Sequence, residues 1–115
     1  MGITYKEGSG RIEVKKGEKV IGAIKWGVNF CGFWEIWDLY IDSYYQGNGY
    51  GRELVDRVKA GIGFEKAIFV EAGSREGRSV FVSALNFWEH MGFYDAPKKY
   101  LQPSLTSVTM VYGWY

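Results

Sequence analysis

Residues 41–52 read IDSYYQGNGYGR and join an apolar, strand-like run to a run with helical periodicity. Three glycines, Gly47, Gly49 and Gly51, occupy every second position across this junction. The first turn of a helix has backbone N–H groups without an intrahelical acceptor, and it carries a partial positive charge. Glycine allows a ligand to approach such a backbone without meeting a Cβ atom. The segment therefore predicts a binding site for a pyrophosphate, and hence for a nucleotide-type cofactor.

The composition of the chain is that of a folded protein without a strong charge bias. Its length of 115 residues predicts a single domain over residues 1–115. A hydrophobic fraction of 47% and a charged fraction of 23% argue against a disordered chain. The net charge is +1, so neither nucleic acid nor an anionic membrane is expected as a partner. The sequence shows no signal peptide and no membrane-spanning run, which predicts a cytoplasmic protein.

Two residue types that often carry catalysis occur only once each. Cys31 cannot form an intrachain disulfide, and one thiol does not make a thiolate zinc cage, so no metal site is predicted. The ordinary interpretation of Cys31 is a small, half-buried residue beside a glycine. A hydrolase triad would need His90, and no Ser or Cys lies in a nucleophile-elbow pattern. The sequence therefore does not indicate a covalent acyl-enzyme.

The residues before the glycine-rich segment predict an antiparallel meander. Residues 1–10 form either a loop or a short edge strand. Alternation of polar and apolar residues, interrupted by turn residues, predicts strands at 11–14, 19–28 and 33–42, joined by turns at 15–18 and 29–32. The last of these strands is dense in aromatic and β-branched residues, which favour sheets.

The residues after this segment predict a crossover to a parallel strand. A helix is expected over residues 49–61, ended by Gly61 and Gly63. An apolar strand at 66–72 then lies parallel to strand 33–42. Helical spacing assigns four apolar residues of the helix to one face: Leu54, Val55, Val58 and Ile62. The charged residues are expected on the solvent-exposed face: Arg52, Glu53, Asp56, Arg57 and Lys59.

The C-terminal part predicts a second helix and a closing strand. A loop at 73–77 precedes a helix over 79–91, and Gly92 follows where a left-handed residue is wanted. A polar connection at 97–103 leads to a strand at 106–112. The predicted fold is α/β in the broad (α+β) sense: a mixed, largely antiparallel sheet with helices packed on it and one parallel pair of strands.

The glycine spacing excludes two common nucleotide-binding motifs. The dinucleotide fingerprint needs a different glycine spacing and an acidic, ribose-binding residue at the end of the next strand. The phosphate-binding loop of nucleoside triphosphatases needs Gly-Lys-Ser/Thr, which is absent here. The pattern that fits is Gln46-x-x-Gly49-x-Gly51. With it the sequence resembles the GNAT superfamily of acetyl-CoA-dependent N-acetyltransferases, which carry Arg/Gln-x-x-Gly-x-Gly/Ala between a strand and the following helix.

A second element of that family occurs in the expected order. The family ends a later helix with Ala-x-x-Phe-Tyr-x-x-x-Gly-Phe, and the residues here that match are Ala84, Phe87, Gly92 and Phe93. The resemblance runs from about Trp26 to the C-terminus, and the chain looks like a short member. Trp88 replaces the family's usual tyrosine and Phe81 an asparagine. The N-terminal region has no room for the two helices that usually help to cover the acceptor.

The resemblance implies that acetyl-CoA lies between strands 33–42 and 66–72, which splay apart. Its pyrophosphate would rest on the amides of 47–52, and its pantetheine would pair with residues 39–41 like an added strand. A backbone N–H there would polarise the thioester carbonyl. Either Arg52 or Lys59 meets a cofactor phosphate, or both are solvated helix charges. The cofactor-binding residues implied are Leu39, Tyr40, Ile41, Gln46, Gly47, Asn48, Gly49, Tyr50, Gly51 and Arg52.

The activity implied is direct transfer of acetyl to a primary amine, which needs a base because the amine arrives protonated. Glu35 is the candidate base. It lies six residues before Ile41, on the same face by period-two alternation, and the histone-acetylating branch places its catalytic glutamate at this offset. Neighbouring Trp34 and Trp37 are expected to raise its pKa. The alternative for Glu35 is an ordinary surface glutamate.

Other groups are candidates for the same chemistry. Asp38, expected on the opposite face from Glu35, is the weaker choice of base. Tyr94 or His90 is the candidate acid that protonates the leaving thiolate. Tyr94 could instead only pack against its neighbours or start the next loop. The thiolate could also leave unaided or take its proton from water. Trp88 has no titratable proton to donate.

Aromatic residues raise a separate expectation about partners. One group forms either an acceptor surface that holds an ammonium by cation–π attraction or a core plus a dimer face: Phe30, Phe33, Trp34, Trp37, Tyr40, Tyr44 and Tyr45. Trp114 and Tyr115 suggest that the C-terminal end docks on another surface, such as a second subunit of a homodimer. The acceptor is a small-molecule or peptide amine. Two alternatives to the enzyme are a non-catalytic acyl-CoA-binding module and a structural or interaction domain on the same scaffold.

Overall fold

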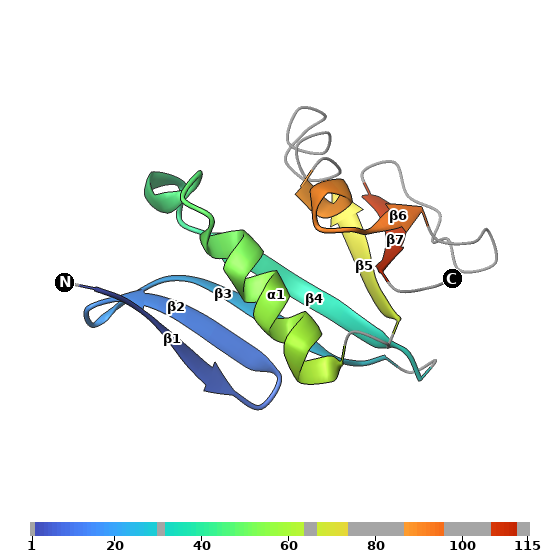
Figure 1. Ribbon diagram of the computed structural model, residues 1–115, viewed down its shortest axis with the longest axis horizontal. Coiled ribbons are helices and arrows are strands. Elements are labelled where there is room, and N and C mark those ends of the chain that lie inside the picture. The colour runs from blue at the N-terminus through green and yellow to red at the C-terminus, as the bar shows by residue number, and fades with distance from the viewer. Residues whose placement is uncertain (1, 30–31, 64–66, 74–86, 96–106, 113–115) are drawn as a thin grey trace.

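The computed structural model describes residues 2–29, 32–63, 67–73, 87–95 and 107–112 (Figure 1). Within these residues, seven strands form one sheet in the order β1-β2-β3-β4-β5-β7-β6. The β4–β5 pair is parallel and the other neighbouring pairs are antiparallel. The elements are β1 (Ile3–Gly8), β2 (Arg11–Lys16), β3 (Lys19–Val28), β4 (Trp34–Ile41), the 3-10 turn η1 (Ser43–Tyr45), α1 (Tyr50–Ile62), β5 (Ile68–Gly73), β6 (Tyr94–Asp95) and β7 (Ser107–Tyr112).

The predicted mixed sheet with one parallel pair is therefore confirmed. Strand 19–28 has the predicted bounds, and residues 1–10 contain the edge strand β1. The helix continues through Gly61 and ends at Gly63, whose N–H donates to the carbonyl of Lys59 at 2.8 Å. Strand β6 was not predicted, because two residues are too few to show an alternation.

Helix α1 lies across one face of the sheet, over β2, β3 and β4 (Figure 1). Three residues at helical spacing, Leu54, Val55 and Val58, are fully buried against this face. The sheet contributes alternate residues to the same core, including Ile12 and Val14 of β2. Burial of such side chains stabilises the fold by about 1.5–3 kcal/mol each. The packing fixes the N-terminal end of α1 beside the end of β4.

Only part of the second predicted helix lies within the described residues. Residues 87–90 are helical, whereas 79–86 lie outside them, as do the predicted connection 97–103 and loop residues 74–77. The helix ends as predicted: Gly92 has φ of +91°, and its N–H donates to Glu89 while that of Phe93 donates to Trp88. This pair of bonds is a Schellman motif, which satisfies the last carbonyls of the helix.

A β-bulge at Trp37 interrupts the regular alternation of β4. Lys25 pairs with Asp38, but the next residue of β3 pairs with Ile36, so β4 has one extra residue. A bulge of this kind reverses which face each later residue occupies. Trp37 lies across β3, where a Cβ on Gly27 would come within 2.3 Å of its ring.

The bulge corrects two predictions about the candidate base. Antiparallel partners share a face, and Glu35 pairs with Gly27 whereas Ile41 pairs with Gly22. These glycines are five residues apart on β3, so Glu35 and Ile41 lie on opposite faces, not on the same one. Asp38, opposite Lys25, lies on the same face as Glu35, not on the other. Both errors arise because period-two counting fails across a bulge.

None of the helices within the described ranges has the length and apolar character that a bilayer span requires.

Candidate functional site

The parallel strands β4 and β5 pair over three residues only. Their register runs from Trp34↔Ile68 to Ile36↔Val70. Beyond that point β4 continues to Ile41 beside β3, and β5 continues beside β7. Figure 1 shows the two strands close at one end and diverging toward the other. The predicted splayed pair is therefore present, and the separated ends of these strands open a cleft.

The cleft has a volume of about 880 Å³. This volume is in the range of small-molecule and cofactor sites, roughly 300–1,000 Å³. Most of the residues predicted from the glycine motif line it. The lining residues are Glu35, Ile36, Trp37, Asp38, Leu39, Tyr40, Ile41, Tyr45, Gln46, Gly47, Gly49, Tyr50, Gly51, Arg52, Val70, Phe87 and Trp88. They come from both faces of the sheet, since Ile41 and Glu35 lie on opposite faces.

One wall of the cleft is the loop between β4 and α1. The loop starts where the N–H of Asp42 donates to the carbonyl of Ile21, and Gln46 turns back so that its Nε2 donates to the carbonyl of Ile41 at 2.9 Å. Gly47 and Gly49 both have φ of +83°, which disfavours any residue with a Cβ. The first backbone bond of α1 runs from the N–H of Glu53 to the carbonyl of Gly49.

The backbone N–H groups of residues 47–52 form a set of free donors. None of these six groups donates to another residue that the structure describes. A Cβ added at Gly47 or Gly49 would meet nothing within 4 Å, so the space in front of the loop is open. Free N–H groups at a helix start, beside two glycines with open surroundings, suit a phosphate group. The loop therefore fits the pyrophosphate that the sequence predicted there.

The third glycine of the motif has a different surrounding. A Cβ on Gly51 would lie 3.5 Å from the ring of Phe87 and 3.9 Å from Ile41, which are ordinary contact distances. Gly51 therefore lies where α1 approaches the second helix across the cleft. An alanine fits at this position, in keeping with the Gly/Ala choice of the motif.

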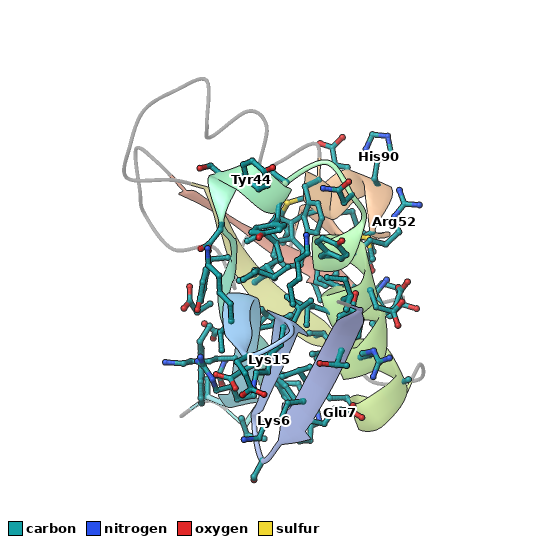
Figure 2. The ribbon with its side chains drawn as sticks, turned by 90° about the vertical axis from the view of Figure 1, so that its left-hand side faces the viewer. Lys6, Glu7, Lys15, Tyr44, Arg52 and His90 are labelled. Carbon is teal, nitrogen blue, oxygen red and sulfur yellow. The ribbon has the colours of Figure 1, made fainter. Side chains whose placement is uncertain are left out.

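The two cations proposed for the cofactor phosphates have different positions. Arg52 is exposed, lines the cleft and projects away from the start of α1 (Figure 2). It forms no ion pair with any other described side chain. Lys59, in contrast, is only 6% exposed, and its Nζ donates to the carbonyl of Met91. The prediction that Lys59 lies on the solvent-exposed face of α1 and meets a phosphate or solvent is wrong.

The surroundings of Lys59 explain its burial. Its Nζ lies 4.0 Å from the ring centroid of Tyr112 and 5.7 Å from that of Phe93. Burial lowers the pKa of Lys59 from its ordinary value, and the nearby charge of Asp56 opposes this shift. The ammonium group thereby joins α1 to the carbonyl of Met91 at the end of the second helix. This bond supports the helix whose residues Phe87 and Trp88 line the cleft.

Trp88 forms part of an aromatic stack below the cleft. It is 6% exposed, and its ring packs edge-on against Phe87 and Phe93 at centroid distances of 5.1 and 5.0 Å. It occupies the position where the resemblance would place a tyrosine. The cleft wall at this position is therefore apolar.

The candidate base is held by a neighbouring amide. Oε1 of the half-buried Glu35 accepts a hydrogen bond of 2.9 Å from Nδ2 of Asn29. The other end of that amide accepts from the N–H of Phe33 at 3.1 Å. Asn29 thus fixes the carboxylate of Glu35 to the turn between β3 and β4. The sequence did not single out Asn29, although Asn is typical of turns and bonds readily to nearby backbone.

The two candidate acids lie elsewhere. Tyr94 is in β6, which is separated from β5 by β7, and it does not line the cleft. His90 is exposed at the end of the second helix and does not line the cleft either (Figure 2). The structure therefore brings Glu35 and the glycine loop to one cleft and leaves Tyr94 and His90 outside it.

The aromatic group of the sequence does not form one surface. Phe33 packs against Phe69 at 5.1 Å, whereas Trp34 and Tyr45 pack against the main core. Trp37 and Tyr40 are exposed and line the cleft, and Tyr44 is 86% exposed. Phe30, Cys31, Trp114 and Tyr115 lie outside the described residues, as do Phe81 and Ala84.

Comparison with known proteins gives one family and a set of similar structures. The model of the acetyltransferase (GNAT) domain matches residues 9–95. No curated protein sequence matches the chain. Protein PH1933 from Pyrococcus horikoshii OT3 has a TM-score of 0.72 at 23% identity, covering 90% of this chain and 64% of that one.

Two further structures carry an acetyltransferase name. The acetyltransferase from Thermus thermophilus has a TM-score of 0.69 at 17% identity, covering 88% of this chain and 61% of that one. The PaiA N-acetyltransferase from Thermoplasma acidophilum, solved in complex with coenzyme A, has a TM-score of 0.66 at 13% identity, covering 90% and 60%. At these identities the likeness shows a shared fold. The chain spans less than two-thirds of the length of each of these three structures.

Proposed function

Because the chain belongs to the GNAT acetyltransferase family, we propose that it transfers acetyl from acetyl-CoA to a primary amine. One observation carries this proposal: six backbone N–H groups without a described acceptor, residues 47–52, belong to a loop that forms one wall of a cleft between two diverging strands. Such a site suits a diphosphate joined to a long, narrow chain. A structure of similar fold was solved with coenzyme A.

The chain's own residues would bind the cosubstrate at two places. The N–H groups of the loop would hold the pyrophosphate, and Arg52 would add a positive charge beside it. The edge of β4 from Trp37 to Ile41, which faces the cleft, would pair with the amides of the pantetheine arm. A backbone N–H on that edge would stabilise the negative charge that develops on the thioester oxygen. Acetyl-CoA supplies the acetyl group and a thiolate leaving group.

Glu35 is the proposed general base. Its carboxylate would take a proton from the acceptor ammonium, so that the free amine can attack the thioester carbon. The new C–N bond forms, the C–S bond breaks, and the thiolate takes a proton from water. Since Tyr94 and His90 do not line the cleft, we propose no acid from either residue. Asn29 would keep the carboxylate of Glu35 directed at its place in the cleft.

We further propose that the acceptor is a small-molecule or peptide amine. Glu35, Trp37, Asp38 and Tyr40 line the cleft from the face opposite α1, so the amine would arrive from that side. The exposed carboxylate of Asp38, the half-buried one of Glu35 and the two exposed aromatic rings suit a cation. Residues 1–115 are proposed to act as one cytoplasmic domain, alone or as a homodimer.

A second function is favoured by Trp88. Its buried indole stands where the resemblance places a tyrosine, which supports a module that binds acyl-CoA without turnover. Calorimetric titration with acetyl-CoA, followed by chromatographic detection of coenzyme A released in the presence of a panel of amines, separates the two. Binding with amine-dependent release supports the transferase, and binding without release supports the module. If no heat of binding is observed, both proposals fail.

A further inference from the structure

The exposed side chain of Asn48 bridges the loop before α1. Its Nδ2 donates to the carbonyl oxygen of Tyr45 at 2.9 Å and to that of Gln46 at 3.4 Å. Asn48 stands between Gly47 and Gly49, whose positive φ angles turn the chain back on itself. The carboxamide can therefore reach carbonyls two and three residues earlier in the chain.

These two bonds fix the direction of the peptide groups in the loop. A carbonyl that accepts from Asn48 points at that side chain and cannot turn toward the open space in front of the loop. A carbonyl directed outward would place a partial negative charge beside a bound phosphate. Because a peptide group is planar, holding the carbonyl of Gln46 also fixes the direction of the N–H of Gly47. A donor fixed before binding loses less conformational entropy when a ligand arrives.

No other described side chain supplies this restraint. The cap of α1, Gly49, has no side-chain cap bond, and Gln46 bonds instead to Ile41 at the end of β4. Gly47 and Gly49 have no side chains, and even an added Cβ would touch nothing within 4 Å. Glycines with positive φ also allow many other backbone conformations, so the loop needs an anchor. Asn48 is that anchor among the residues that the structure describes.

We propose that Asn48 is a positioning residue that holds the loop N–H groups ready for the pyrophosphate of acyl-CoA. This inference rests on the proposed function, since the ligand is the same. Asn48 acts through the backbone and not by its own contact with the reacting atoms. Its effect should therefore be confined to ligands that carry the pyrophosphate.

Two variants and two ligands test the proposal. Asn48→Ala removes the donor, and Asn48→Asp keeps the shape but replaces the donor with a carboxylate. Each ¹⁵N-labelled protein is titrated with coenzyme A and, separately, with pantetheine, which lacks the phosphates, and amide shifts give both dissociation constants. Asn48→Ala should weaken coenzyme A binding by about five- to tenfold, and Asn48→Asp by more, since its charge repels the phosphates. Pantetheine affinity should not change.

The outcomes separate the inference from the proposed function. If the wild-type protein binds coenzyme A and both variants bind it equally well, the inference is wrong and the proposed function stands. An equal loss of affinity for coenzyme A and pantetheine would mean that Asn48 only supports the general structure, which also overturns the inference. A wild-type protein that binds neither ligand contradicts the proposed function and the inference together.

Discussion

Replacing Gly49 by alanine would separate the effect of the loop on ligand binding from its effect on folding. Gly49 has φ of +83°, and its added Cβ would meet nothing within 4 Å. Gly32, in the turn between β3 and β4, is a matched control. Its φ is +87°, its added Cβ also meets nothing within 4 Å, and it does not line the cleft. The two substitutions therefore impose the same backbone strain at different distances from the proposed phosphate site.

The two variants should lose similar stability and differ in affinity. An L-residue in the left-handed region costs about 1–2 kcal/mol, so both should unfold more easily by that amount. For a domain of this size, each kcal/mol lowers Tm by roughly 4–8 °C. Only Gly49→Ala places a methyl group in front of the loop donors. Loss of one hydrogen bond to a charged phosphate, about 1.5–3 kcal/mol, should weaken coenzyme A binding roughly 10- to 150-fold.

Calorimetric titration with coenzyme A, below the Tm of both variants, measures the difference. Differential scanning calorimetry without ligand checks that the two proteins are equally destabilised. If Gly49→Ala binds coenzyme A as tightly as Gly32→Ala does, the loop does not hold the pyrophosphate. This holds even if both variants bind coenzyme A more weakly than the wild type, because backbone strain alone would then account for the equal loss.

Substitutions at three other positions test the rest of the proposed site and the buried lysine. Gly51→Ala should leave the affinity for coenzyme A nearly unchanged, because its Cβ makes only ordinary contacts with Phe87. Gly51→Trp should abolish binding, because the indole fills the cleft. Calorimetric titration of both variants with coenzyme A tests the two predictions. Glu35→Gln should lower kcat most at moderate pH while KM for acetyl-CoA stays the same, and an unaltered pH–rate profile would exclude Glu35 as the base. Burial lowers the pKa of Lys59 in the folded protein below its ordinary value of 10.5. At a pH between these two pKa values the unfolded chain binds more protons than the folded one. The free energy of unfolding therefore rises with pH in this window. In urea unfolding, the free energy of unfolding of the wild type minus that of Lys59→Met should therefore rise across this window, and a flat difference would show that Lys59 is not desolvated.

Local patterns predicted most of the described strands and helix α1. Alternation in β3 and helical spacing at Leu54, Val55 and Val58 depend on neighbours within a few residues, so the sequence shows them directly. The glycines at 47 and 49 were informative for the same reason. Their positive φ angles and open surroundings are properties of the loop itself.

What the sequence did not predict depends on contacts between distant segments. The bulge at Trp37 exists in relation to β3, where Gly27 leaves room for the indole, and nothing in β4 alone marks it. Because of this bulge, Glu35 and Asp38 lie on the same face of the sheet. Lys59 was predicted to face solvent because charged residues of a helix usually lie on its exposed face. Its burial follows from Met91 and Tyr112, which lie far along the chain.

The most direct test of the proposed pyrophosphate site is a crystal structure of the protein with coenzyme A bound. We expect the pyrophosphate oxygens to lie within hydrogen-bond distance of the backbone nitrogens of residues 47–52, and the pantetheine to run along the cleft edge of β4. Phosphates bound elsewhere on the protein, or a cleft filled by the protein's own side chains while coenzyme A is bound, would contradict it.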